Sequence, residues 1–491
     1  MLTQLPPWST QITAAKLSRS NAPEQRIPLL LRPIVRAYVL GYASSTAPRF
    51  LTLLLTHLSR RREKMDEKPD YSFHYSMLRI LRGGLELQRF PAFCAAIVGG
   101  STLLELPLRR LFASFGLILT SAVQLRLTRW TSSFVAAWFS LKLLQSKKSD
   151  AFTKDLVYET ANGRVLRPTH FAGRTMDLTL FSVTRALDVL VGEYWTRRKV
   201  ARVNTGKWSD AEKLISMLAD PAIFASSCAL IMWAWIYTPD RLPRSYNKWI
   251  KSAAAVDQRL LLALRRMRYG EIQYGVETGQ APLLQDMCKE YGLPLEFGDP
   301  VMSIPYPCEV VHMGTGKNCE YHALSRFARS FLWAFSTYLP LNLILATRKP
   351  SQKRFKSAVI SSARSSTFLG TFIALYYYGI CFTRSRAGPR ILGASSSSYQ
   401  QIDGGTCIGG GCALCGWSVL IENESRRKEL GLFVAPRALA TLFPRRYLEE
   451  NQWRETLAFA VSTAVVFTCV SEKPSRVRGV LGKLLKKVLS P

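Results

Sequence analysis

Apolar runs recur along the whole chain, with Lys and Arg concentrated between them. A helix that crosses a bilayer needs about 20 predominantly apolar residues. Several of the runs are shorter, and one such run by itself would favour a core helix of a soluble protein. Ten runs with basic flanks favour a membrane bundle, because Lys and Arg side chains reach from helix ends to the headgroups. The runs cover residues 34–55, 92–108, 111–125, 130–144, 222–237, 331–347, 366–382, 407–421, 431–443 and 456–470.

The sequence therefore predicts an all-α fold, a polytopic transmembrane helical bundle with about eight spans (roughly six to ten). The clearest span is the run at residues 222–237, which carries Trp233, Trp235 and Tyr237 near one end. Trp and Tyr gather where a spanning helix meets the headgroups, so this end is expected at a membrane surface.

The charge balance is strongly basic, with 66 Lys and Arg against 34 Asp and Glu. In a soluble chain this excess would indicate nucleic acid as a partner. Here the basic residues lie between apolar runs instead of on one domain, so we expect membrane lipids as partners and no nucleic acid. The ten cysteines are scattered, several of them inside apolar runs, which favours packing as small hydrophobic residues over a disulfide framework.

Composition shifts divide the chain into seven predicted segments. They are an N-terminal polar segment (1–33), a first membrane half (34–145), a polar loop with short helices (146–220), a transmembrane span (221–238), a polar segment with amphipathic helices and a Cys/His box (239–325), a second membrane half (326–472) and a basic amphipathic tail (473–491). The tail is expected on an anionic leaflet. The helices near residues 246–250 and 260–264 fit either a membrane surface or a solvated helical hairpin.

One twelve-residue pattern occurs twice, at the end of an apolar run in each membrane half. Both copies have the form Gly-x-Ser-x-Leu-x-Glu-x3-Arg-Arg, which predicts two repeat-related halves. On a helix, the Ser, the Glu and the first Arg share a face, so the Glu can pair with the Arg where the helix leaves the hydrocarbon. Pro107 is expected to interrupt the first helix. The motif residues are Gly99, Ser101, Leu103, Glu105, Arg109 and Arg110, and Gly416, Ser418, Leu420, Glu422, Arg426 and Arg427.

This repeat has two interpretations. A structural ion pair at the helix end is favoured over a substrate-binding role. Many transporters, however, are built from duplicated membrane halves with a site at the repeat interface.

A Cys/His box precedes the run at residues 331–347. Cys308, His312, Cys319 and His322 have the residue types of a tetrahedral zinc site, but their spacing is not that of a standard zinc finger. A glycine turn around residues 314–316 with an optional disulfide is favoured, so we expect no metal and no cofactor. The sequence contains no complete phosphate loop, zinc-protease helix or serine-hydrolase elbow, and we expect no catalytic residue.

At several of these residues the chain resembles the transmembrane protein 135 family. The resemblance rests on Pro307-Cys308-Glu309-x-x-His312 with Cys319, on Tyr338-Leu339-Pro340-Leu341, on residues 362–370 and on Glu422-x-x-Ser425-Arg426-Arg427. It covers most of residues 239–491 and, through the repeat, residues 82–110. Met313 departs from the family pattern, where Pro follows the His. The glycine-rich repeats are also similar to those of the mitochondrial inner-membrane translocase channel family.

The resemblance implies a multi-span protein of peroxisomal or mitochondrial membranes that takes part in lipid and sterol handling. We therefore expect a non-enzymatic organelle membrane protein that supports lipid or sterol transport or organelle homeostasis. The peroxisome is favoured and the mitochondrion is second. A translocase-like pore or carrier of the mitochondrial inner membrane is the alternative, and assembly into a homo- or hetero-oligomer stays open. An enzyme would require His312 or Cys308 to act on a lipid.

Overall fold

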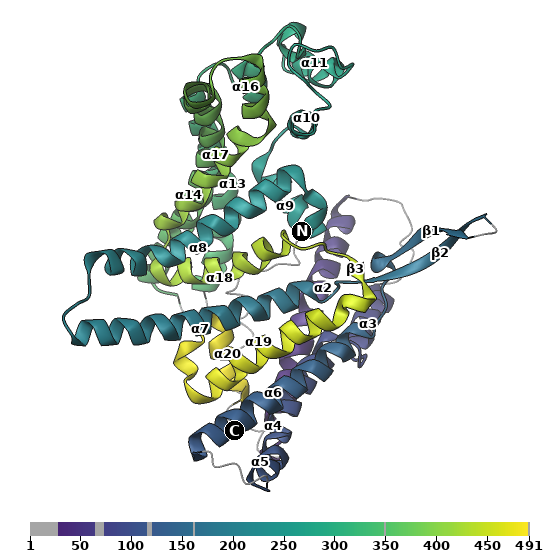
Figure 1. Ribbon diagram of the computed structural model, residues 1–491, viewed down its shortest axis with the longest axis vertical. Helices are drawn as coiled ribbons and strands as arrows, with labels where there is room; N and C mark the ends of the chain where they lie inside the picture. Colours follow the sequence, from purple (N-terminus) through teal and green to yellow (C-terminus); the bar gives the residue numbers. More distant parts are fainter. Residues whose placement is uncertain (1–27, 64–72, 115–119, 161–162, 348–349, 490–491) are drawn as a thin grey trace. The chain divides into compact units, whose positions relative to one another are not determined.

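The computed structural model describes residues 28–63, 73–114, 120–160, 163–347 and 350–489. Helices make up 79% of the structure, which confirms the predicted helical class (Figure 1). The chain forms two compact units, which are unit 1 (Met1–Lys207 with Pro444–Pro491) and unit 2 (Trp208–Phe443). Most of the predicted N-terminal polar segment lies outside the described residues.

Unit 1 takes its elements from both ends of the chain. They are α2 (Arg32–Glu63), α3 (Phe73–Gly84), α4 (Phe90–Leu103), α5 (Glu105–Ser114), α6 (Ser121–Gln145), η2 (Asp150–Phe152), β1 (Thr153–Thr160), β2 (Gly163–Ala172), α7 (Met176–Asn204), β3 (Tyr447–Leu448), η8 (Glu449–Asn451), α19 (Gln452–Glu472), η9 (Pro474–Arg476) and α20 (Gly479–Leu489).

Helix α6 packs against both α4 and α19. Small residues allow the close approach of α4, because a Cβ added to Gly100 would lie only 2.7 Å from the Cβ of Ala136. Phe93, Leu141 and Phe459 fill the core that these three helices share. Unit 1 is thus a helical bundle in which α19, from the end of the chain, completes the core.

The segment at residues 146–220, predicted as a loop with short helices, is mostly regular structure. Strands β1 and β2 form an antiparallel hairpin with Thr153 opposite His170, and β3 adds a short third strand. The strands are rich in β-branched and aromatic side chains, which favour extended structure. The all-α prediction therefore needs a small correction in unit 1.

The rest of that segment is helical. Helix α7 has 29 residues. Ser209 then begins the next helix through a capping box with Glu212, in which each side chain bonds the backbone N–H of the other. Polar composition does not prevent helix formation, since helix propensity and capping act locally.

Unit 2 contains the remaining elements. They are α8 (Asp210–Tyr237), η3 (Pro239–Arg241), α9 (Arg244–Ala254), α10 (Gln258–Arg268), α11 (Ala281–Glu290), η4 (Leu295–Gly298), α12 (Cys308–Val311), α13 (Cys319–Ala346), α14 (Gln352–Phe382), η5 (Thr383–Ala387), α15 (Gly388–Leu392), α16 (Ser396–Gln401), η6 (Ile402–Thr406), α17 (Cys407–Cys415), η7 (Gly416–Ile421) and α18 (Glu424–Ala440).

The core of unit 2 lies where α8, α14 and α17 meet, around Trp235, Tyr376 and Ile408. Glycine brings α14 and α17 together, because a Cβ on Gly411 would lie 2.7 Å from the carbonyl oxygen of Tyr376. Figure 1 shows α13, α14 and α17 running together in this unit. This close packing places the last turns of α14 next to α17, and the candidate site of unit 2 lies nearby.

The predicted surface helices bury their apolar faces inside the protein. In α9 and α10, Ile250, Leu261 and Met267 are buried in the core of unit 2. In α20, Val488 is buried against unit 1 while its lysines stay exposed. These apolar faces are therefore used for packing within each unit, so they do not require a membrane surface.

Five helices in the described part of the chain are long enough and apolar enough to cross a membrane. They are Phe90–Ser114, Asp210–Tyr237, Gln352–Leu392, Ser396–Ile421 and Glu449–Glu472. These helices support a membrane protein, but the predicted count of about eight spans is not confirmed. The apolar runs in α2, α6 and α13 belong to long helices whose other residues are too polar for a span of this kind.

Candidate functional site

The Cys/His box forms a tight loop between α12 and α13. Met313, Gly314 and Gly316 all have positive φ angles, so the backbone turns back on itself. The turn lets the Nδ1–H of His312 donate to the carbonyl of Gly316 over 2.6 Å. Together, the turn and this bond bring potential ligand atoms of Cys308, His312 and Cys319 within 4.8 Å of one another.

His322 does not join these three residues as a ligand. Its ring stacks on His312 with 4.3 Å between the centroids and 10° between the planes. Both ring nitrogens are buried and have no hydrogen-bond partner among the described residues. Burial, and next the neighbouring His312, lower the pKa of His322 to about 3, so its ring is neutral at physiological pH.

A cysteine from another helix lies against His312. The Sγ of Cys381, near the end of α14, lies 3.2 Å from the Nε2 of His312. Sequence spacing could not identify this residue, because it lies 69 positions away and stands inside an apolar run. The structure therefore places Cys381 beside the Nε2 of His312, whereas His322 stacks on the ring.

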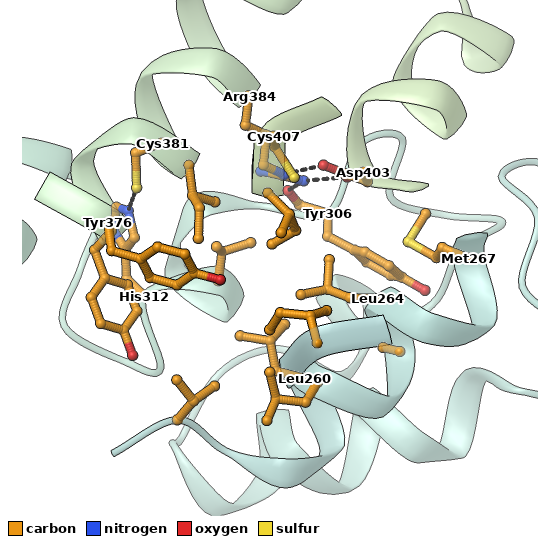
Figure 2. Close-up of a pocket in the computed structure, with 18 of the residues that line it drawn as sticks. Leu260, Leu264, Met267, Tyr306, His312, Tyr376, Cys381, Arg384, Asp403 and Cys407 are labelled. Carbon is orange, nitrogen blue, oxygen red and sulfur yellow. Dashed lines mark hydrogen bonds and ion pairs between the residues drawn. The ribbon is translucent and has the colours of Figure 1, made fainter. Parts of the chain in front are cut away.

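A small cavity of about 50 Å³ lies beside this cluster in unit 2. Figure 2 shows Leu260, Leu264 and Tyr376 along its apolar wall, with Arg384 and Asp403 at a polar end. The cavity has room for a few water molecules and is too small for a lipid chain.

The polar end is a buried ion pair carried by two π-helical turns. Arg384 Nε lies 2.6 Å and Nη2 3.0 Å from the carboxylate oxygens of Asp403, and Nη2 also donates to the Tyr306 carbonyl over 2.6 Å. The Tyr274 hydroxyl donates to the same carboxylate over 2.5 Å. Every charge in this pair has a partner, which burial requires. π-helical turns are often found at functional sites.

The sequence carries a signal for this ion pair that apolar periodicity does not reveal. Asp403 is the only acidic residue between Glu320 and Glu422. An ionisable residue inside an apolar stretch marks a functional site by default, with an Arg as its expected partner.

The first copy of the repeat motif is split between two helices. Helix α4 ends at Leu103 and α5 begins at Glu105, because Pro107 has no N–H for the Leu103 carbonyl. Glu105 pairs with Arg129 of α6 at 3.2 Å instead of with Arg109. Ser101 donates to the backbone of its own helix. The predicted pair of Glu105 with Arg109 on one helix is therefore replaced by a pair of Glu105 with Arg129 on a neighbouring helix.

The second copy is also interrupted, at Glu422 between η7 and α18. Here the predicted pairing within the motif is present, with Arg426 Nη1 3.5 Å from a Glu422 oxygen. Ser365 of α14 also donates to Glu422 over 2.8 Å. Gly416 allows α8 to approach, since a Cβ there would lie 2.4 Å from the Cα of Ala225. This copy fits the structural interpretation, an ion pair at a helix end.

Unit 1 contains a larger and more polar pocket of about 450 Å³, at the ends of α6 and α19. Four cationic side chains and two carboxylates line it, together with three aromatic residues and other groups. The cations are Lys142, Lys147, Lys148 and Arg174, the carboxylates are Glu449 and Glu450, and the aromatic residues are Phe152, Phe171 and Trp453. The excess of cations makes the pocket suited to an anionic group.

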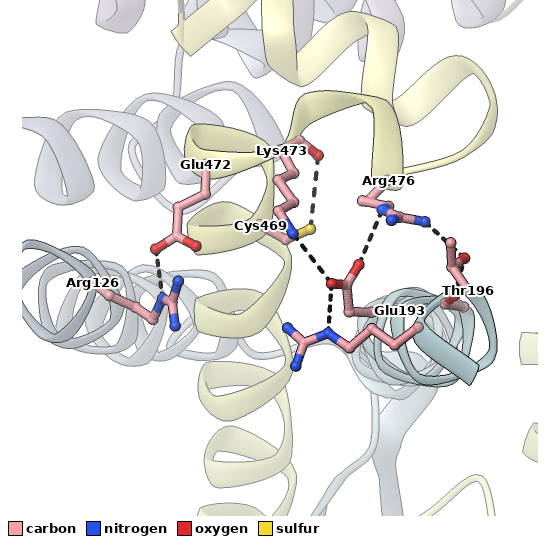
Figure 3. Close-up of polar contacts among 9 residues, drawn as sticks. Arg126, Glu193, Thr196, Cys469, Glu472, Lys473 and Arg476 are labelled. Atoms are coloured by element: carbon pink, nitrogen blue, oxygen red, sulfur yellow. Dashed lines mark hydrogen bonds and ion pairs between the residues drawn. The ribbon is translucent and has the colours of Figure 1, made fainter. Parts of the chain in front are cut away.

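A second charged cluster in unit 1 joins α7 to the turn after α19 (Figure 3). Glu193 accepts from Arg197 over 2.9 Å and from Lys473 over 3.2 Å, and it pairs with Arg476 at 3.0 Å. The Arg197 bond, and next the Lys473 bond, lower the pKa of Glu193. One carboxylate thus holds three cations, which ties the C-terminal turn to α7.

Comparison with family models, with curated protein sequences and with solved structures gives no match to this chain.

Proposed function

We propose that this chain is a non-enzymatic integral membrane protein of an intracellular organelle, and that it supports lipid transport or organelle homeostasis. The peroxisome is the favoured organelle and the mitochondrion is second. Five helices with the length and composition of membrane spans support the membrane location. The resemblance of the Cys/His box and the Glu422 motif supports the choice of organelle.

The observation that carries the lipid proposal is the basic pocket of unit 1. Its lining includes Gln452 and Trp453, at the beginning of an apolar helix that can cross a membrane. Basic pockets at the ends of spanning helices bind lipid headgroups, and Trp is typical of the interface. An anionic phospholipid would place its phosphate among the lysines and its chains along the apolar helices. Of the two lipid classes considered, this favours phospholipid over sterol.

Headgroup recognition is tested with two charge-matched double variants. Lys142→Gln with Lys148→Gln removes two cations from the pocket, and Lys199→Gln with Lys207→Gln removes two exposed cations that do not line it. Each protein is purified in detergent, and the bound phosphatidic acid and phosphatidylcholine are measured by mass spectrometry. We expect several-fold less phosphatidic acid on the pocket variant and little change on the control.

Transfer of fluorescent phosphatidic acid between vesicles by the reconstituted proteins supplies the functional readout. The proposal predicts transfer by the wild-type chain that falls with the pocket variant. Equal lipid content in both variants, or no transfer by the wild-type chain, would contradict it.

A translocase-like pore or carrier is the second candidate. The glycine contacts between α14 and α17 support it, since a Cβ on Gly379 would lie 2.8 Å from the carbonyl oxygen of Gly410. Such contacts let the backbones of membrane helices approach closely. Purified protein in planar bilayers should then conduct ions, and the absence of any conductance would argue against a pore.

A further inference from the structure

We infer that unit 2 contains a structural zinc site formed by Cys308, His312, Cys319 and Cys381. Three thiolates and one imidazole are a donor set that zinc binds in structural sites. This site is independent of the proposed lipid function, because it lies in unit 2 while the basic pocket lies in unit 1.

The distances fit a single tetrahedral ion. With Zn–S and Zn–N bonds of about 2.3 and 2.0 Å, ligand atoms around zinc lie roughly 3.5–3.8 Å apart. The Nε2 of His312 lies 3.2 Å from Cys381 Sγ, and the ligand atoms of Cys308, His312 and Cys319 all lie within 4.8 Å of one another. The thiols of Cys308 and Cys381 are both within hydrogen-bonding reach of Cys319. Binding of one ion would bring the four ligand atoms to these separations.

The orientation of His312 also fits coordination. Its Nδ1–H donates to the Gly316 carbonyl, which leaves the lone pair of Nε2 directed toward the thiols. A backbone carbonyl on the other ring nitrogen is the usual way in which proteins fix a metal-binding His. Gly316 has a φ of 101°, which favours glycine at this position. His322 stacks on the ring of His312 and restricts the rotation of this ring, without supplying a ligand atom.

An occupied site would carry little net charge. Zinc binding releases the three thiol protons to solvent, and three thiolates with Zn²⁺ carry a net charge of −1.

The site has a structural role because all four positions come from the protein. No position is left for a substrate or a reactive water, in contrast to catalytic zinc sites. The ion would join the loop of the Cys/His box to the end of α14, next to the buried pair of Arg384 and Asp403.

The test is the metal content of the full-length protein, purified in detergent without chelators or a His tag. We expect about one zinc per chain by mass spectrometry. X-ray absorption should give three sulfur neighbours at about 2.3 Å and one nitrogen at about 2.0 Å. Cys381→Ser should reduce the zinc content at least tenfold. Cys288→Ser, at a buried position outside the ligand set, should keep it.

Several results would overturn the site. They are a wild-type protein free of zinc, a protein that holds iron in its place, or a disulfide among the three cysteines in the chain as isolated. Full zinc content in Cys381→Ser, or a shell with fewer than three sulfurs, would equally contradict it. The wild-type measurements decide the question even where a variant fails to fold.

Discussion

Arg384 and Asp403 form the most deeply buried ion pair in the described part of the chain, with side chains 6% and 3% exposed. Removing one partner leaves the other charge buried and unpaired, which costs about 3–5 kcal/mol. Asp403→Asn should therefore lower the free energy of unfolding of unit 2 by that amount. Thermal denaturation in detergent measures the effect, and Arg384→Met combined with Asp403→Asn should recover part of the loss.

Arg386 provides the matched control, because it pairs with Glu320 and both side chains are about half exposed. An exposed pair contributes about 0–1 kcal/mol, so Arg386→Gln should have a small effect. Equal destabilisation by Arg386→Gln and Asp403→Asn would show that burial does not set the importance of this pair.

The spacing of residues in the sequence predicted contacting side chains only where the partners are close in sequence. It identified Cys308, His312 and Cys319, which a single loop brings together. It could not identify Cys381, because its position depends on how α14 packs against that loop. Similarly, the predicted Glu–Arg pair is present at Glu422, whereas in the first copy an arginine from a neighbouring helix takes the place of Arg109.

At the scale of elements, the contact between α14 and α17 depends on the position of each glycine. A Cβ on Gly411 would lie 2.7 Å from the Tyr376 carbonyl oxygen, whereas a Cβ on Gly409, two residues earlier, would meet no atom within 4 Å. Gly411→Ala should destabilise unit 2 by about 1–3 kcal/mol. Gly409→Ala should be neutral or stabilise the helix by up to about 1 kcal/mol. Thermal denaturation of the two proteins checks this, and similar midpoints would show that the close packing is not required.

The Glu193 cluster makes the C-terminal turn sensitive to acid. The ion pairs of Glu193 lower the pKa of its carboxyl group below the usual 4.5. The ionised carboxylate therefore stabilises the folded protein fully above pH 4.5, and this stabilisation is lost as the pH falls below that value and the carboxylate takes up a proton. Amide exchange at residues 474–489, corrected for its intrinsic pH dependence, should therefore accelerate below about pH 4.5. Glu193→Gln should show the faster exchange already at pH 7.

Asp210→Asn is the control for this experiment, because Asp210 pairs with Lys213 of its own helix. It should leave exchange at residues 474–489 unchanged. Unchanged exchange in Glu193→Gln would mean that the cluster does not hold the turn.

Apolar periodicity identified the helices of the core more reliably than it identified polar elements. The run at residues 222–237 lies within α8, whose polar first turns were missed because they carry charged residues. Helix α7 and the β1–β2 hairpin lie in the segment that was predicted as a polar loop. The many charged residues of this segment led to that prediction, although its local sequence favours regular structure. The amphipathic pattern of α10 and α20 was recognised, but the surface that covers each apolar face is set by tertiary packing.

At the scale of the whole molecule, the sequence led to the helical class and to the two motif-bearing segments, which lie in different units. The number of spans could not be predicted, because short apolar runs fit both a buried core helix and a membrane helix. Five helices satisfy both length and composition, and others such as α6 combine apolar residues with several charges.

We propose above that this chain is an integral membrane protein of an organelle. Carbonate extraction of membranes that contain the tagged protein, together with fractionation against peroxisomal and mitochondrial markers, is the experiment that tests this proposal. The protein should stay in the carbonate-resistant pellet and follow the peroxisomal marker. A carbonate-resistant pool with the mitochondrial inner membrane would favour the pore instead, and a carbonate-soluble protein would contradict the claim.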